Sequence, residues 1–500
     1  MIELTLRELA DIVGGTLHDV EDPAVAVTGA VEFDSRRIAA GDLFLALPGA
    51  RTDGHDFAAG AVAAGAVAVL AARPVRVPAI VVPPVSATDR RALALEHDTD
   101  GAGAAVLAAL GRLARAVVDR LVAGGLTVVG VTGSAGKTST KDLIAQVLAP
   151  LGPVVAPPGS FNNELGHPYT ALRATADTRF LVLELSARGP GHIAALTEIA
   201  PPSIGAVLNV GTAHLGEFGS REVIAQAKGE LVAALPPTGV AILNADDPRV
   251  AAMADRTTAR VVMVGQAANA DVRATDIQLD DRARARFTVH ADGKQLPVRL
   301  AVHGEHQIGN ALTAIAVALA CGATVEDAVA AVSGAEIASA HRMDVRTRAD
   351  GVTVVNDSYN ANPDSVRAAL KALVTMARAG ATDRPGGKRR SWAVLGEMGE
   401  LGDESVLEHD GIGRLAVRLD VDRLIVIGTG RPAHALHQGA VQEGSWGREA
   451  LRVPDIAAAL EILDEEIEPG DVVLVKASNS AGLWAVANHL NSSNTPEAAR

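Results

Sequence analysis

The sequence predicts an α/β protein of three domains, two of them built on mostly parallel, doubly wound sheets. The chain has 500 residues, which is too long for a single hydrophobic core. From residue 126 onward, short β-branched runs alternate with helical segments, as in a parallel sheet covered on both faces. A glycine-rich loop joins the first of these runs to a helix, which is typical of the ligand-binding edge of such a sheet.

The N-terminal domain, residues 1–84, is predicted to be a small α/β module. It contains an early helix, an apolar segment over 41–47 and an alanine-rich helix that starts near Phe57. A strand at 79–82 ends at two prolines, because proline lacks the N–H that a strand ladder needs. Residues 85–122 follow as a linker or insertion and a helix. The acidic stretch at 96–103 is expected at the surface, and the helix is predicted over 104–122.

The central and C-terminal domains are assigned to residues 123–335 and 336–500. Both contain short apolar strands bounded by turns. The predicted strands of the central domain are 126–132, 180–185, 204–210, 240–243 and 261–264. Those of the C-terminal domain, whose spacing predicts a Rossmann-like sheet, are 352–356, 392–396, 424–428 and 472–476. The polar residues 491–500 are expected to fray.

Composition limits the partners and the location. The net charge is −14, from 45 basic and 59 acidic residues, which argues against a nucleic-acid or anionic membrane surface. The single cysteine, Cys321, excludes an intramolecular disulfide, and its alanine-rich neighbourhood favours a small buried residue over a nucleophile. No apolar run approaches the ~20 residues of a membrane-spanning helix. We expect a cytoplasmic protein with no nucleic-acid partner and no membrane insertion, and nothing demands more than a monomer.

The glycine-rich loop is the strongest chemical signal. Its backbone amides and the N-terminus of the helix at 138–148 offer partial positive charge to an anion. Lys137 is expected to reach the outer phosphates of a nucleotide and Thr138 to hold Mg²⁺. The alternative is a plain glycine-rich turn with a surface lysine, and the strand before and the helix after favour the phosphate loop. The loop consists of Gly133, Ser134, Ala135, Gly136, Lys137, Thr138 and Ser139.

A carboxylate at the end of a later strand is the candidate metal ligand. Glu184 follows the apolar run at 180–183. The carboxyl ends of parallel strands face the crevice in which α/β proteins bind ligands. We therefore expect Glu184 to hold a metal ion, and the alternative is a structural charge at a strand end.

Motifs along nearly the whole chain resemble the Mur ligases of peptidoglycan synthesis. The N-terminal domain has DSR at 34–36, and the central domain has FNNELG at 161–166, NVGTAHL at 209–215, AKGE at 227–230 and NADDP at 244–248. The C-terminal domain has NDSYNANPDS at 356–365 and LGEMGELG at 395–402. These last two are similar to the branch of the family that adds D-alanyl-D-alanine, whereas siblings that add a single amino acid typically carry His where Asn360 stands.

The resemblance implies an ATP-dependent amide-bond ligase that works through an acyl phosphate. Its substrates would be UDP-N-acetylmuramoyl-tripeptide and D-Ala-D-Ala, with two Mg²⁺ ions in the site. The third residue of the tripeptide, meso-diaminopimelate or lysine, stays open. One metal ion would sit with Thr138 or Ser139 and Glu184, and the second with His214. Lys228 would carry CO₂ as a carbamate that supports the second ion, so that Lys137, Glu184, His214 and Lys228 form the catalytic set.

The metal role of His214 and the carbamate role of Lys228 each have a plainer structural alternative. A lone histidine such as His214 is more often a structural hydrogen-bonding residue than a ligand. Lys228 could be an ordinary helix-surface lysine paired with Glu222 or Glu230.

The resemblance also assigns the nucleotide contacts. Asn310 would bind adenine, and its alternative role is the N-cap of a helix at 311–320. Arg342 would reach the phosphates and Asp357 the ribose. Because these two residues come from another domain than Lys137, we expect a hinge closure that brings them together.

The remaining residues are assigned to the substrates. Asn162, Asn163, Asn360, Asn362 and Lys476 would bind them, the last three near the dipeptide and the tripeptide tail. Ser35 and Arg36 of the N-terminal domain would meet the uridine nucleotide. The alternatives there are a turn-capping serine and a solvated arginine.

The motifs disfavour three other functions. A single-amino-acid Mur enzyme or a folylpolyglutamate synthase is disfavoured by the NANP stretch at 360–363. A non-catalytic nucleotide-binding scaffold is disfavoured because Lys137, Glu184, His214 and Lys228 are all present. A P-loop kinase would leave the motifs of the C-terminal domain unexplained.

Overall fold

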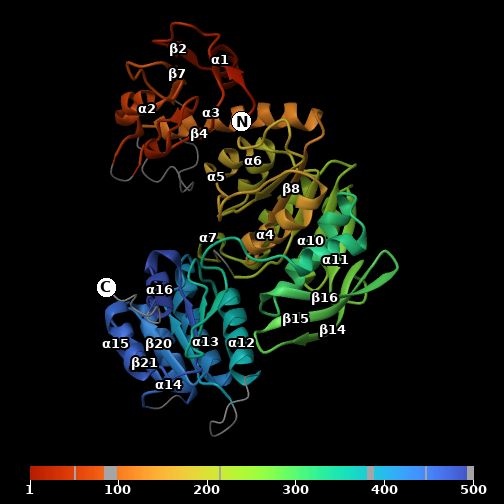
Figure 1. The fold of residues 1–500 in the computed structure, drawn as a ribbon, viewed down its shortest axis with the longest axis vertical. Helices are drawn as coiled ribbons and strands as arrows, with labels where there is room; N and C mark the ends of the chain where they lie inside the picture. The colour runs from red at the N-terminus through yellow and green to blue at the C-terminus, as the bar shows by residue number, and fades with distance from the viewer. Residues whose placement is uncertain are drawn as a thin grey trace.

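The computed structural model describes residues 1–49, 52–83, 98, 100–212, 215–379, 388–444 and 447–492. Figure 1 shows three α/β domains arranged along the long axis, with the N-terminal domain at one end and the C-terminal domain at the other. Each domain has a sheet of its own, as the sequence predicts. Among the described helices, none is both long and apolar enough to cross a bilayer.

The N-terminal domain is a five-stranded sheet in the order β2-β7-β6-β5-β4, in which only β2 runs antiparallel to its neighbour. Leu43 and Leu45 of β5 join the cluster on one face, and Phe44 between them joins the cluster on the other. This alternation reflects the two-residue period of a strand. The strands are β2 (Thr16–His18), β4 (Val31–Glu32), β5 (Leu43–Leu45), β6 (Ala68–Ala71) and β7 (Ala79–Val81), with the ladder β1 (Leu4–Thr5) and β3 (Ala26–Val27) and the helices α1 (Leu6–Val13) and α2 (Ala58–Ala64).

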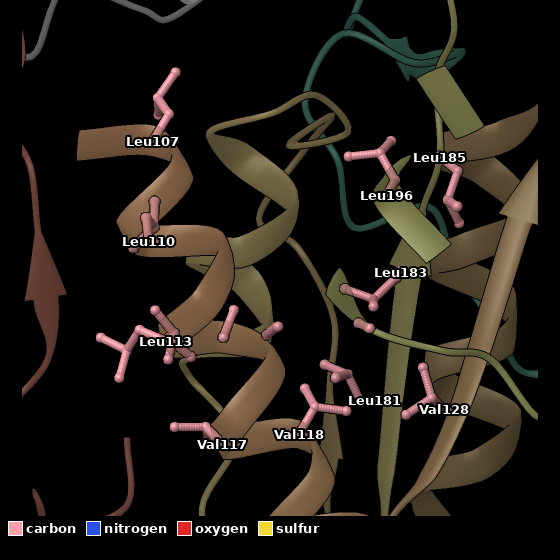
Figure 2. Close-up of a cluster of buried hydrophobic side chains, with 14 of the residues drawn as sticks. Leu107, Leu110, Leu113, Val117, Val118, Val128, Leu181, Leu183, Leu185 and Leu196 are labelled. Atoms are coloured by element: carbon pink, nitrogen blue, oxygen red, sulfur yellow. The ribbon is translucent and has the colours of Figure 1, made fainter. Parts of the chain in front are cut away.

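The long helix α3 (Ala102–Ala123) joins the first two domains. The Asp98 carboxylate accepts the backbone N–H groups of Gly103 and Ala104 at 3.0 and 2.9 Å, so an acidic residue caps the N-terminus of the helix. In Figure 2, Val118 points toward the central sheet, whereas Val117 points to the opposite side. Both domains therefore share one hydrophobic cluster. The rest of the predicted acidic stretch lies partly outside the described residues.

The central domain is a nine-stranded sheet in the order β16-β15-β14-β13-β12-β11-β8-β10-β9. The strands from β9 to β14 are parallel, and β15 and β16 extend the sheet as an antiparallel hairpin. The five predicted strands are present as β8 (Thr127–Thr132), β10 (Phe180–Glu184), β11 (Ile204–Val207), β12 (Val240–Asn244) and β13 (Arg260–Gly265). Four were not predicted, namely β9 (Val154–Val155), β14 (Val272–Leu279), β15 (Arg284–Ala291) and β16 (Lys294–His303).

Helices cover both faces of the central sheet. The face that packs toward α3 carries α5 (Gly166–Ala171), α6 (His192–Ile199) and α8 (Arg221–Ala233). The other carries α4 (Lys137–Leu148), α10 (Gln307–Ala320) and α11 (Val325–Ser333). Two short helices, α7 (Leu215–Phe218) and α9 (Pro248–Ala251), follow β11 and β12. Cys321, just after α10, is half-buried, and burial raises the pKa of its thiol to about 11, so it stays protonated at neutral pH.

The C-terminal domain is a six-stranded sheet in the order β17-β18-β22-β19-β20-β21, parallel except for β17. The four predicted strands are β18 (Thr353–Asn356), β19 (Ser391–Leu395), β20 (Arg423–Ile427) and β22 (Val472–Lys476), and the unpredicted ones are β17 (Asp344–Thr347) and β21 (Ala450–Val453). The helices are α12 (Pro363–Ala379), α13 (Ser405–Arg418), α14 (Arg431–Glu443), α15 (Ile456–Glu466) and α16 (Trp484–Ser492). Of the tail expected to fray, 493–500 lie outside the described residues and the first two residues belong to α16.

Candidate functional site

A cavity of about 880 Å³ lies where the carboxyl ends of the central strands meet the C-terminal domain. Its walls include the phosphate loop, the end of β10 and the loops after β11, β18 and β22. Parallel sheets bind their ligands at this edge. Most of the residues predicted for the nucleotide and the dipeptide line this cavity: Ser134, Ala135, Gly136, Lys137, Thr138, Ser139, Asn162, Asn163, Glu184, Asn310, Arg342, Asp357, Asn360, Asn362 and Lys476.

The phosphate loop is held in shape by Asn209, at the end of β11. The Ala135 N–H donates to the Asn209 side-chain oxygen at 2.9 Å, and the Ser134 N–H donates to the Asn209 carbonyl at 3.1 Å. Gly136 ends the loop with φ of 82°, a left-handed conformation that favours glycine. A Cβ at this position would meet the Asn310 side-chain oxygen at 2.9 Å. Asn310 and the loop are therefore packed as one unit.

Lys137 is the half-buried cation of the loop. Its Nζ donates to the Gly133 carbonyl at 2.8 Å. Burial lowers the pKa of this amine, the Glu184 charge opposes that shift, and Arg342 adds to it. An anion bound beside Lys137 would therefore relieve an electrostatic cost that the protein carries by itself.

Glu184 and Thr138 meet at the mouth of the loop. The Thr138 hydroxyl donates to Glu184 Oε2 at 3.0 Å, and Asn162 Nδ2 donates to Oε1 at 2.8 Å. Ser160 Oγ lies 2.8 Å from the Thr138 hydroxyl. Hydroxyl and carboxylate oxygens are the ligands that Mg²⁺ prefers, so this donor set fits the ion. No group of three or more His, Cys, Asp or Glu side chains suited to a metal occurs in the described part of the chain.

Lys228 is buried on α8, with 4% of its surface exposed. Burial and the charge of Lys137 hold the pKa of its amine well below the ordinary value. The surface-lysine alternative is wrong, because the side chain is buried, Glu222 pairs with Arg249 at 2.8 Å, and Glu230 accepts two backbone N–H groups at the N-terminus of α6. His214, the predicted ligand of the second metal ion, lies outside the described residues.

Asn310 is inside α10, three residues after its start, so the N-cap alternative is also wrong. The helix begins earlier than predicted, and His306 occupies the cap position without a side-chain cap bond. Asn310 Nδ2 donates to Gln307 Oε1 at 2.8 Å, which fixes the amide beside the phosphate loop. His306 also lines the cavity, and the sequence prediction did not include it.

The C-terminal domain contributes a buried ion pair to the cavity. Lys476 Nζ donates to Asp357 Oδ2 at 2.6 Å and to the Asn360 carbonyl at 2.9 Å. Burial lowers the pKa of the Lys476 amine, and the Asp357 charge opposes this. The pair fixes the start of the asparagine-rich motif, and Asn362 Nδ2 reaches the Ser134 carbonyl of the phosphate loop at 3.3 Å.

The C-terminal domain is engaged on the phosphate loop in this structure. Arg342 Nη2 donates to Ser160 Oγ at 3.0 Å and to the Thr138 hydroxyl at 3.3 Å, while its guanidinium lies 4.3 Å from the Tyr359 ring centre. Asp364 accepts the Thr212 N–H at 3.0 Å. The sequence prediction missed Tyr359 and Asp364, although both belong to the quoted motif. The described contacts thus correspond to a closed arrangement.

Ser35 and Arg36 lie away from this cavity, in a short 3₁₀ turn (Ser35–Arg37) capped by Asp34. Arg36 is exposed and pairs with Asp34 at 2.8 Å, and this bond lowers the pKa of the Asp34 carboxyl to about 2. The turn is nevertheless connected to the central domain. Phe33 packs on Tyr169 with ring centres 5.3 Å apart, and Tyr169 stacks on Phe161 at 5.5 Å. The two predicted substrate segments, 34–36 and 161–163, therefore meet at an aromatic cluster.

Comparison with known proteins agrees with this geometry. Family models match residues 29–117 (Mur ligase family, catalytic domain), 131–318 (Mur ligase middle domain) and 341–479 (Mur ligase, glutamate ligase domain). The chain belongs to the Mur ligase family. A relative from Mycobacterium tuberculosis, named UDP-N-acetylmuramoyl-tripeptide–D-alanyl-D-alanine ligase, is 63% identical over 99% of both chains. The ligase of the same name from Escherichia coli is 33% identical over 99% of this chain and 100% of its own.

Solved Mur ligases have the same three-domain fold. The crystal structure of MurF from Acinetobacter baumannii matches with a TM-score of 0.82 at 30% identity over 98% of both chains. MurF from Thermotoga maritima in complex with ADP matches with a TM-score of 0.74 at 28% identity, over 93% of this chain and 97% of that one. The match to an ADP complex supports ATP use by this Mur ligase.

Proposed function

We propose that this Mur ligase uses ATP to join D-Ala-D-Ala to UDP-N-acetylmuramoyl-tripeptide, giving the UDP-muramoyl-pentapeptide precursor of peptidoglycan, ADP and phosphate. The observation that carries the proposal is the full-length similarity, at 63% identity, to a ligase of that name. The geometry agrees, because one cavity holds both the phosphate loop and the motif with Asn360 and Asn362.

The nucleotide half of the cavity supplies positive charge and fixed donors. Lys137 and Arg342 lie beside Thr138, where the outer phosphates of ATP would end. Asn310 would hold the adenine, and Asp357, at the start of the C-terminal motif, the ribose. Mg²⁺, held by Thr138 and Glu184, would neutralise charge on the phosphate oxygens. Phosphoryl transfer requires mainly such positioning and electrostatic stabilisation.

The amide bond would form in two balanced steps. A terminal carboxylate oxygen of the tripeptide attacks the γ-phosphorus of ATP, and ADP leaves. The amine of D-Ala-D-Ala then attacks the acyl carbon, phosphate leaves with that oxygen, and the amine loses a proton. Asn360, Asn362 and Lys476, which line the same cavity as Lys137, would hold the dipeptide and the tripeptide tail.

The environment of Lys228 supports a carbamate. A neutral amine reacts with CO₂, and burial keeps this amine neutral at a lower pH than an exposed lysine. The carbamate would place an anion beside Lys137, where a protonated lysine would be repelled. His214 and this carbamate would hold the second ion.

The UDP end of the substrate is assigned to the N-terminal domain. Ser35 and Arg36 stand beside the aromatic cluster of Phe33, Phe161 and Tyr169, and Asn162 and Asn163 continue from it to Glu184. This path would lead the peptide from the nucleotide toward Lys137. We propose in addition that the protein acts in the cytoplasm as a monomer, since its water-soluble substrates meet within one chain.

Phosphate release tests the proposal. With ATP and Mg²⁺, release should require UDP-muramoyl-tripeptide and D-Ala-D-Ala together. Equal turnover with free D-Ala, or no turnover with the dipeptide, would overturn the substrate assignment.

A further inference from the structure

A buried ion pair on the phosphate-loop helix has no place in the chemistry described above. Lys141 and Asp142 of α4 are 2% and 4% exposed, and Lys141 Nζ lies 2.6 Å from Asp142 Oδ1. They stand one helical turn after Lys137 and Thr138, so they extend the same helix faces away from the loop. Burying such a pair is costly unless further hydrogen bonds satisfy it. Its other partners therefore indicate what the pair holds.

The partners of the pair lie in two segments that are distant in sequence. Lys141 Nζ donates to the Pro157 carbonyl at 2.8 Å and the Gly159 carbonyl at 3.3 Å. These carbonyls lead into Ser160, which bonds both Thr138 and Arg342. Lys141 Nζ also reaches Ser339 Oγ at 3.3 Å, and Asp142 Oδ2 accepts the Ser339 N–H at 2.9 Å.

Ser339 belongs to the linker between the central and C-terminal domains. One turn further along α4, the Gln146 amide accepts the Glu336 N–H at 3.0 Å and donates to the Glu336 carbonyl. The linker backbone is therefore bound to the phosphate-loop helix at two positions, 336 and 339. Up to Ser339 the chain is therefore bound to the central domain.

Two residues later the chain is bound to the C-terminal domain instead. The His341 carbonyl accepts the Tyr359 N–H at 3.2 Å, and its ring nitrogen lies 2.9 Å from Asn356 Nδ2. The His341 ring also stacks on Trp484, with centres 6.3 Å apart. His341 has a φ of 58° and Met343 a φ of 49°, so the backbone turns sharply on both sides of Arg342.

We infer that Lys141 and Asp142 are positioning residues that anchor the fixed side of an interdomain hinge at Ala340. The pair holds Ser339 and the 157–160 segment on the phosphate-loop helix, and so places Arg342 and Ser160 at Thr138 before nucleotide binds. The inference rests on the proposed ATP site. It predicts that loss of the anchor weakens ATP binding but leaves the chemical step intact once ATP saturates, because saturating ligand restores the closed state.

The variants are chosen so that folding and anchoring separate. Lys141→Met with Asp142→Leu replaces both members of the buried pair, which avoids an unpaired buried charge. Gln146→Ala removes the two bonds to Glu336 and one bond to the Asp142 carbonyl within α4, and it leaves the Lys141–Asp142 pair in place. Gln438→Ala, on α14 of the C-terminal domain, is the matched glutamine control.

The readouts are steady-state kinetics and an interdomain distance. Spin labels at Glu198→Cys and Glu461→Cys, both exposed, report on the central and C-terminal domains in a Cys321→Ser background. The double variant should raise the KM for ATP about 10-fold with kcat within about 3-fold, and Gln146→Ala should raise it about 3-fold. Pulsed dipolar spectroscopy without ligand should give a broader distance distribution in both variants but not in Gln438→Ala.

Two results would overturn the inference. One is a folded double variant with a lowered Tm but an unchanged KM for ATP and an unchanged distance distribution, because the pair would then be structural only. The other is a distance distribution that broadens equally in Gln438→Ala. Since the distance is measured without nucleotide, it tests the anchor even if the wild-type protein shows no ligase turnover.

Discussion

Replacing Glu184 by glutamine tests the nucleotide half of the site. Glu184 accepts the Thr138 hydroxyl at 3.0 Å and Asn162 Nδ2 at 2.8 Å. Glutamine has the same shape: its oxygen can accept the Asn162 Nδ2 bond, and its NH₂ group can donate to the Thr138 hydroxyl, so both contacts remain as neutral hydrogen bonds. A bond to a charged group contributes about 1 kcal/mol more than a neutral one, so the free energy of unfolding should fall by about 2 kcal/mol. The carboxylate charge, however, is lost from the Mg²⁺ position.

We expect kcat to fall about 10²- to 10³-fold, equivalent to about 3–4 kcal/mol of transition-state stabilisation, with a raised Mg²⁺ requirement. The assay is phosphate release with ATP, UDP-muramoyl-tripeptide and D-Ala-D-Ala across a Mg²⁺ titration, together with thermal unfolding. Glu230→Gln is the matched control, because Glu230 also accepts two hydrogen bonds, from the Gly191 and Ala194 N–H groups, but does not line the cavity. If Glu184→Gln keeps the wild-type kcat and Mg²⁺ requirement, as Glu230→Gln should, the metal role of Glu184 is wrong.

Substitutions at three further residues test other parts of the site. Lys228→Ala should lose activity that added bicarbonate or a short carboxylic acid partly restores, and no rescue under any condition would contradict the carbamate. In CO₂-free buffer, the lowered pKa of Lys228 in the folded protein should make the free energy of unfolding rise with pH between that pKa and about 10.5, because the unfolded state binds the extra proton over this range. Lys228→Met should reduce this slope, measured by urea unfolding at pH 7 and pH 9. Gly136→Ala should raise the KM for ATP at least 10-fold, because it places a Cβ 2.9 Å from the Asn310 oxygen at a backbone φ of 82°. The control Gly293→Ala, at a φ of 73° with open space around it, should cost about 1 kcal/mol of stability and leave that KM unchanged. Tyr169→Phe removes the hydroxyl that donates to Glu32 at 3.3 Å, and it should raise the KM for the UDP substrate about 3-fold without changing the KM for ATP. A change in the KM for ATP alone would be inconsistent with the proposed path of the peptide from the N-terminal domain toward Lys137.

The sequence predicts the buried parallel strands well, because they are short apolar runs that tertiary context does not alter. It failed at β14 to β16, which form the outer part of the central sheet. There, one face of the sheet is buried and the other carries charged side chains, so the apolar runs are interrupted. The alternation Arg284-Ala285-Arg286-Phe287 was nevertheless a usable signal for a half-buried strand.

The site residues that sequence analysis found are those at strand ends and in motifs, such as Glu184, Asn310 and Arg342. Their place in one cavity could be expected from the parallel topology. The position of Asn310 inside the helix could not be expected, because the helix begins after His306, which makes no side-chain cap bond that would mark the start in the sequence. The Lys141–Asp142 pair was missed because a polar residue in a helix usually faces solvent, and here the 157–160 segment and the linker both pack against it.

The most direct test of the central claim follows the oxygen atoms of the substrate carboxylate. UDP-muramoyl-tripeptide labelled with two ¹⁸O atoms in its terminal carboxylate is incubated with the protein, ATP and D-Ala-D-Ala, and the ¹⁸O content of the products is measured by mass spectrometry. The proposed function predicts one ¹⁸O in the released phosphate and one in a UDP-muramoyl-pentapeptide. A pentapeptide formed without ¹⁸O in the phosphate, or phosphate released without any pentapeptide, would contradict it.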